Sequence, residues 1–146
     1  MLKYSEVKTI IDPRKIMSIQ ILEPIQIQLT ENFIDENYPS INFQFEATAK
    51  QFSSIIDCKG EIYIEYSIFD EFIFQLKKKE NNAILTDMNK QFNLEIIFLQ
   101  NRFKFLWEFS KKSIDGSNIK IEFSNIISEE VFLMIRNQFI EYPKWW

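Results

Sequence analysis

The sequence predicts a two-layer α+β domain: a mainly antiparallel β-sheet of about six to eight strands, with two amphipathic helices packed on one face. Several segments alternate apolar and polar residues, which is typical of half-buried strands. Two other segments place apolar residues three and four positions apart, as amphipathic helices do. Short turn signals between consecutive strands favour antiparallel pairing. With 146 residues and no linker-like segment, we expect a single domain, residues 1–146.

The first strands are predicted in residues 25–30 and 41–49, where apolar residues alternate with polar ones. Pro24 fits the start or the edge of the first strand, because proline has no N–H to donate to a sheet. The polar stretch 31–40 between the two strands predicts a connection.

A hairpin with arms 52–57 and 61–66 is predicted next. Gly60 would close its turn, residues 57–60, because glycine readily adopts a positive φ. One face of the second arm is apolar. The other face carries Glu61, Tyr63 and Glu65.

A helix follows, and its start is predicted at Ser67, with Asp70 three residues later in a variant of the capping box. Lys77–Lys79 would complement the negative end of the helix dipole, and Asn81–Asn82 would end the segment. The apolar stripe expected to face the core is Phe69, Phe72, Ile73 and Leu76.

A second run of strands is predicted in residues 92–99, 103–109 and 119–123. The short step Gln100–Asn101 separates the first two, and Asp115–Gly116 is a turn signal before the third.

The chain closes with a helix that Ser128 is expected to cap and that ends before Pro143. Its apolar face is predicted to include Phe132, Ile135 and Phe139. After it come Trp145 and Trp146. We expect this tail to fold back and pack, and the alternative is an anchor for a partner, since tryptophan is enriched at binding hot spots.

The composition excludes most catalytic chemistry. The chain has 17 Lys plus Arg, 21 Asp plus Glu, a net charge of −4 and no histidine. The lack of histidine removes Ser-His-Asp triads and most zinc sites. The acidic balance argues against nucleic-acid binding, which relies on Lys and Arg contacts to phosphate. We therefore predict a protein that is not an enzyme and has no cofactor, metal ion or nucleic-acid partner.

Carboxylates alone remain as catalytic groups, and a carboxylate enzyme is the least favoured function. Glu61 and Glu65 share a strand face about 13 Å apart along it, farther than the carboxyl pairs of glycosidases. Cys58 has no histidine to activate its thiol. No apolar run reaches membrane-spanning length, and residues 1–10 do not resemble a secretory signal. We expect a cytoplasmic location and no membrane partner.

Surface acids form the most informative residue set. On its own, such a set is a solubilising face. Its functional interpretation is an acidic patch that captures a basic protein partner through electrostatic steering. The candidate partner-binding residues are Asp35, Glu36, Glu46, Asp57, Glu61, Tyr63 and Glu65.

The hydrophobic pattern of Glu61–Lys79, Ala83–Phe109 and Asn118–Phe139 resembles that of small bacterial immunity proteins. The similarity is to those of polymorphic and contact-dependent toxin systems, particularly the immunity group of the wall-associated toxin system. This resemblance implies a cytoplasmic protein that binds the C-terminal toxin domain of its own system and occludes the active site or an adjacent surface. Such toxins are often nucleases with basic clefts. The alternative is a structural or assembly module, of phage-related kind, that self-associates through an open sheet face.

Overall fold

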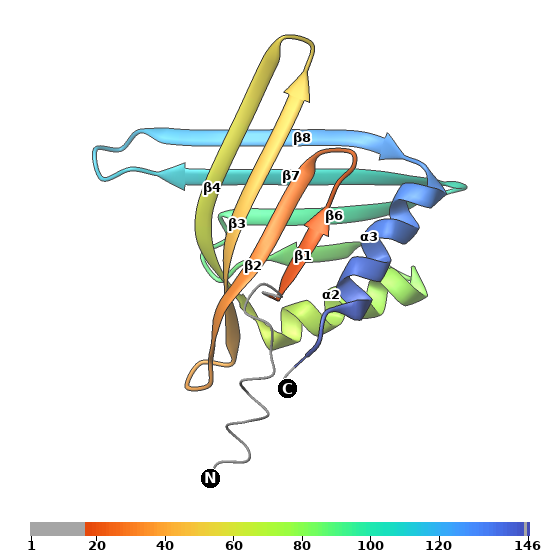
Figure 1. Ribbon diagram of the computed structural model, residues 1–146, viewed down its shortest axis with the longest axis horizontal. Helices are drawn as coiled ribbons and strands as arrows, with labels where there is room; N and C mark the ends of the chain where they lie inside the picture. The colour runs from red at the N-terminus through yellow and green to blue at the C-terminus, as the bar shows by residue number, and fades with distance from the viewer. Residues whose placement is uncertain (1–16, 145) are drawn as a thin grey trace.

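The computed structural model describes residues 17–144 and 146, and within them eight strands and two helices confirm the α+β class. The strands form two four-stranded antiparallel sheets (Figure 1). Sheet A contains β1 (Ser18–Ile21), β2 (Gln26–Asp35), β3 (Ser40–Gln51) and β4 (Ser54–Glu65) in that order. Sheet B contains β5 (Ala83–Thr86), β6 (Phe92–Leu99), β7 (Arg102–Lys112) and β8 (Asn118–Ile127). The helices are α2 (Tyr66–Lys78) and α3 (Glu129–Glu141).

In the described part of the chain, each half has the same order of elements: four antiparallel strands followed by a helix. The halves interlock, because α2 packs against β5 of sheet B while α3 packs against β1 of sheet A and against α2. The two sheets face each other with their strands crossing, and the helices lie together at one side (Figure 1). The sequence predicts most of these strands and both helices but not the division into two sheets. β4 and β5, which α2 separates in the chain, belong to different sheets.

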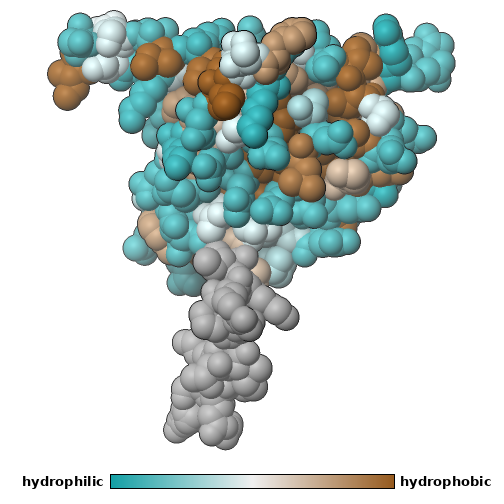
Figure 2. Space-filling view, turned by 45° about the horizontal axis from the view of Figure 1, so that its top comes forward, coloured by the Kyte–Doolittle hydropathy of each residue, from teal (hydrophilic) through white to brown (hydrophobic). Residues whose placement is uncertain are grey.

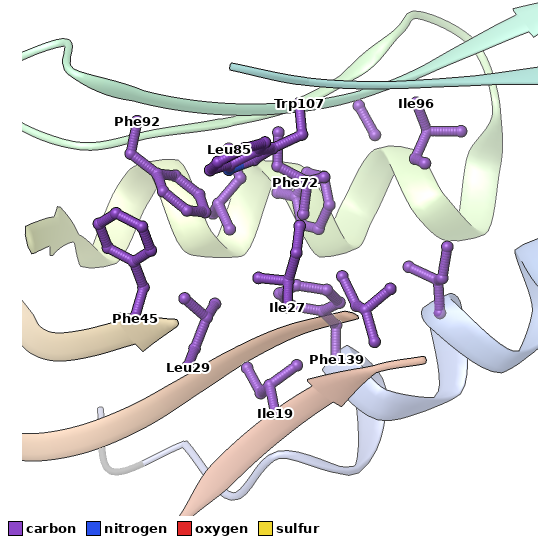
Figure 3. Packing of buried hydrophobic residues seen from close by; sticks show 14 of the residues in the cluster. Ile19, Ile27, Leu29, Phe45, Phe72, Leu85, Phe92, Ile96, Trp107 and Phe139 are labelled. Atoms are coloured by element: carbon purple, nitrogen blue, oxygen red, sulfur yellow. The ribbon is translucent and has the colours of Figure 1, made fainter. Parts of the chain in front are cut away.

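A single hydrophobic cluster fills the space between the sheets and the helices. In Figure 3, Ile27, Leu29 and Phe45 point from sheet A toward Phe92 and Trp107 of sheet B. The ring of Phe45 lies 5.2 Å from that of Phe92, centroid to centroid. Because the inner faces of both sheets are apolar, each can be shielded from water only by the other sheet and the helices.

The predicted turn at residues 57–60 is wrong. β4 runs without interruption through Gly60, which pairs with Phe45 on β3. A Cβ atom on Gly60 would lie 2.7 Å from Cε1 of Phe45, so the glycine makes room for this ring. The turn lies earlier, beyond the end of β3, where Phe52 has a φ of 55°.

The predicted polar connection at residues 31–40 is also wrong, because β2 continues to Asp35. A β-bulge between Glu31 and Phe33 shifts its register against β3. The bulge moves the alternation by one residue, which hides the strand from a strict two-residue pattern. The short strands β1 and β5 also went unpredicted.

The two helix starts differ. Ser128 caps α3 as predicted, its hydroxyl accepting a hydrogen bond from the Val131 N–H at 3.1 Å. The predicted capping box at Ser67 is wrong, because α2 begins at Tyr66 and its N-cap residue, Glu65, makes no side-chain cap. The buried faces of both helices are as predicted: Phe69, Phe72, Ile73 and Leu76 on α2, and Phe132, Ile135 and Phe139 on α3.

Candidate functional site

The structure brings the predicted partner-binding residues to one surface, the outer face of β2, β3 and β4. Cross-strand register places all but one of them there, on the side opposite the core. Glu36 is the exception and lies in the turn between β2 and β3. The residues on the sheet face are Asp35, Glu46, Asp57, Glu61, Tyr63 and Glu65.

Three cross-strand rows organise the half of this face nearest the β2–β3 turn. Asp35, Ser40 and Glu65 form the first row. Phe33, Asn42 and Tyr63 form the second, and Thr30, Gln44 and Glu61 form the third. Successive rows lie about 7 Å apart, because every second residue of a strand faces the same side.

An aromatic pair occupies the middle row. The rings of Phe33 and Tyr63 meet edge to face with centroids 6.1 Å apart. Asn42, between them in the register, is completely buried, and its side-chain oxygen accepts a hydrogen bond from Asn32 at 2.7 Å. Phe33 is nevertheless 48% exposed. Sequence reasoning missed Phe33 because it lies just beyond the bulge, in a segment interpreted as a connection.

The acidic residues divide into two groups by their contacts. Glu46 pairs with Lys59 at 3.5 Å, and Asp57 accepts a hydrogen bond from Thr48. By contrast, within residues 17–144 and 146 no ion pair involves Asp35, Glu36, Glu61 or Glu65. This division could not be predicted from the sequence, because cross-strand partners depend on register.

The turn beside these rows is ordered by Asp35. One of its carboxylate oxygens accepts hydrogen bonds from the N–H groups of Asn37 and Tyr38, at 3.1 and 3.3 Å. Burial and the nearby negative charges of Glu36, Asp35 and Glu31 raise the pKa of the Tyr66 phenol. Glu31, Asp35 and Glu36 therefore bring negative charge together near Tyr66. We call the surface formed by Phe33, Asp35, Glu36, Tyr38, Glu61, Tyr63 and Glu65 the acidic–aromatic face.

The C-terminal tail folds back onto α2, as expected for Trp146. Its indole stacks on Tyr66 with ring centroids 4.4 Å apart, and its N–H contacts both oxygens of Asp70 at 3.1 Å. Lys144 also donates to Asp70, at 2.7 Å. Trp145 lies outside the described residues.

An apolar groove lies away from these rows, between the β3–β4 and β7–β8 hairpins. It encloses about 290 Å³ and is lined largely by Ile25, Ala47, Ala49, Ile56, Trp107 and Phe123. Hydrophobic side chains gather within a hydrophilic surround in the upper half of the molecule in Figure 2. Cys58 on nearby β4 is partly buried, and burial followed by the charge of Asp57 raises the pKa of its thiol.

The part of the chain that the structure describes contains no group of three or more Asp, Glu or Cys side chains arranged to hold a metal ion. Neither α2 nor α3 is long and apolar enough to cross a bilayer. Comparison with protein-family models, curated proteins and solved structures finds no match for this chain.

Proposed function

We propose that this protein is an immunity protein, which binds a cognate bacterial toxin domain through the acidic–aromatic face and neutralises it without catalysis. The observation that carries the proposal is the grouping, around an exposed aromatic pair, of carboxylates that form no ion pair with another described residue. The hydrophobic pattern resembles that of small immunity proteins, and this resemblance supports a toxin domain in the cytoplasm as the partner. We expect that toxin to be a nuclease.

The physical basis is complementarity of charge and of shape. Carboxylates on one surface steer a basic partner and raise its association rate. Aromatic side chains then supply anchor contacts, since tyrosine and tryptophan dominate binding hot spots. A nuclease binds phosphate with a basic cleft, so an acidic partner seated there would occlude the substrate site.

The test is capture of the partner by the tagged full-length protein from its native cytoplasm, followed by mass spectrometry. We expect one dominant partner, a basic domain encoded beside this protein. Glu61→Lys and Glu65→Lys should reduce its capture at least tenfold while leaving the melting temperature unchanged. Glu122→Lys, an exposed charge reversal on sheet B, is the matched control and should retain capture. Equal capture by all variants would exclude this face.

Self-association as an assembly module is the second candidate function. The outer face of sheet B exposes Ile84, Leu99 and Ile126 among charged residues, which favours a covering partner. Sedimentation velocity over a hundredfold concentration range tests it. A stable oligomer that Ile84→Lys dissociates, together with failure to capture a partner, would support the module; a monomer throughout would exclude it.

A further inference from the structure

In the row formed by Asp35, Ser40 and Glu65, the two carboxylates are spaced so that one planar cation fits between them. The three residues lie on adjacent strands in direct register. Because paired strands lie about 5 Å apart, the α-carbons of Asp35 and Glu65 are about 10 Å apart, with Ser40 midway. Two carboxylates at this spacing can flank a single planar group from both sides.

Ser40 supplies an independent observation. Its side chain is on the outer face with the two acids, yet the residue is only 1% exposed. Its hydroxyl oxygen has no hydrogen-bond partner among the described residues. Buried hydroxyl groups without partners are rare in folded proteins, so this one calls for an explanation. An N–H donor that enters between Asp35 and Glu65 and displaces the side chains covering the hydroxyl would satisfy it.

Both acids have carboxylate oxygens that accept no hydrogen bond from the described part of the chain. The turn uses only one oxygen of Asp35, which accepts from Asn37 and Tyr38. Glu65 occupies the N-cap position of α2 but makes no cap hydrogen bond. Within residues 17–144 and 146, neither acid is in an ion pair.

Two aromatic side chains lie next to the row of Asp35, Ser40 and Glu65. The pair of Phe33 and Tyr63 lies in the next row, about 7 Å along the strands. Aromatic faces attract cations, and the planar guanidinium group of arginine also stacks on them. Lysine has a compact ammonium group with three donors, whereas arginine presents five donors in a planar fork that can bridge two carboxylates.

We propose that Asp35, Ser40 and Glu65, together with the Phe33–Tyr63 pair, form a receptor for one arginine side chain of a protein partner. This inference rests on the proposed function and names the group of the partner that the acidic–aromatic face binds. The guanidinium donates to both carboxylates and to the Ser40 hydroxyl oxygen while its edge or face rests on the aromatic pair. A lysine in the same place would reach one carboxylate at a time.

The first experiment needs no partner. Nα-acetyl-arginine amide and Nα-acetyl-lysine amide are titrated into the full-length protein while amide chemical shifts are followed by NMR. We expect saturable shifts with the arginine amide at Ser40, Asp35 and Glu65, and dissociation at least fivefold weaker for the lysine amide. Equal, unsaturable shifts with both compounds would overturn the proposal.

Variants locate the site. Asp35→Asn and Glu65→Gln keep the side-chain shapes and should each weaken arginine-amide binding about tenfold. Glu46→Gln is the matched control, because Glu46 is on the same face but is paired with Lys59. If Glu46→Gln weakens arginine-amide binding as much as the site variants do, the binding depends on general surface charge. That result would overturn the proposal.

Partner capture then separates the two proposals. If arginine amide binds and Asp35→Asn also lowers partner capture, both stand. If arginine amide binds as expected but capture is indifferent to all variants of the face, the receptor stands and the proposed function fails. If capture depends on Glu61 and Glu65 while arginine amide does not bind, the function stands and the receptor fails.

Discussion

The two halves of the chain share an order of elements but differ in the outer faces of their sheets. Sheet B exposes scattered apolar residues, and its charges include a surface ion pair between Lys120 and Glu108. Sheet A also carries such a pair, between Lys59 and Glu46, but it differs in burying two polar residues on its outer side. These are Ser40 and Asn42, which lie in the rows of Asp35 and Glu65 and of Phe33 and Tyr63. The inner faces are apolar in both. The comparison teaches that core packing sets the fold, whereas any binding function depends on the outer face.

The largest expected effect tests the shared interior. Phe45→Ala removes a ring that contacts both Phe92 and Phe109 across the sheet interface. We expect the free energy of unfolding to fall by about 3–5 kcal/mol, as for other buried phenylalanines. Urea denaturation measures it, and Phe52→Ala, at a fully exposed turn, is the control with little expected change. A similar loss for both variants would contradict the interface described.

The next effect concerns the contact that joins the C-terminal tail to sheet A. The buried Tyr142 hydroxyl donates to the Glu31 carboxylate, and burial, followed by this hydrogen bond, raises the pKa of the phenol. Tyr142→Phe should destabilise the protein by about 1–3 kcal/mol, since it leaves a partly buried carboxylate without its donor.

The same contact predicts a pH dependence. An unfolded tyrosine titrates near pH 10, whereas the folded phenol keeps its proton to higher pH. The protonated Tyr142 phenol therefore stabilises the folded state fully below about pH 10. This stabilisation is lost as the pH rises toward the folded pKa, by about 1.4 kcal/mol per pH unit. Urea melts from pH 8 to 11 should show a shallower alkaline loss for Tyr142→Phe than for the native protein. Parallel pH profiles would contradict the assignment.

Much of the fold could be predicted from the sequence, because the core strands alternate strictly and the helix stripes are regular. The predicted strands 41–49, 92–99 and 103–109 are confirmed, and so are both helix faces. The errors fall where tertiary context overrides a local signal. Gly60 indicates a turn by composition, but its place is set by the Phe45 ring on another strand.

The candidate site was predictable only in part. Alternation on β4 placed Glu61, Tyr63 and Glu65 on one outer face, and the structure has them there. Phe33 and Ser40 could not be found, because their positions depend on the bulge in β2 and on cross-strand register. Both arise from pairing between segments distant in sequence, which periodicity within one segment does not report.

A moderate effect sharpens the contrast between the helices of the two halves. Ser128→Ala removes the hydroxyl that accepts a hydrogen bond from the Val131 N–H. It should lower the free energy of unfolding by about 1 kcal/mol. Ser67→Ala, at an exposed position inside α2, should change stability by less than about 0.5 kcal/mol. Thermal melts of the pair check this. If Ser67→Ala loses more stability than Ser128→Ala, Ser67 caps α2 after all, which would contradict a helix start at Tyr66.

The smallest effect is also the most informative about the arginine receptor. Ser40→Ala should leave the free energy of unfolding within about 0.5 kcal/mol of the native value or raise it, because the hydroxyl has no partner among residues 17–144 and 146. Asn42→Ala should cost about 1–3 kcal/mol, since Asn42 is hydrogen-bonded and buried. A large loss for Ser40→Ala would show that its hydroxyl is satisfied in the free protein.

The most direct test of the central claim is the association rate of this protein with its captured basic partner, measured by stopped flow at several salt concentrations. If the acidic–aromatic face receives the partner, the rate should fall steeply as salt screens the charges. Glu61→Lys and Glu65→Lys should lower the rate at least tenfold at low salt, and Glu122→Lys should leave it unchanged. A rate that is independent of salt, or equally reduced by Glu122→Lys, would contradict a binding role for this face.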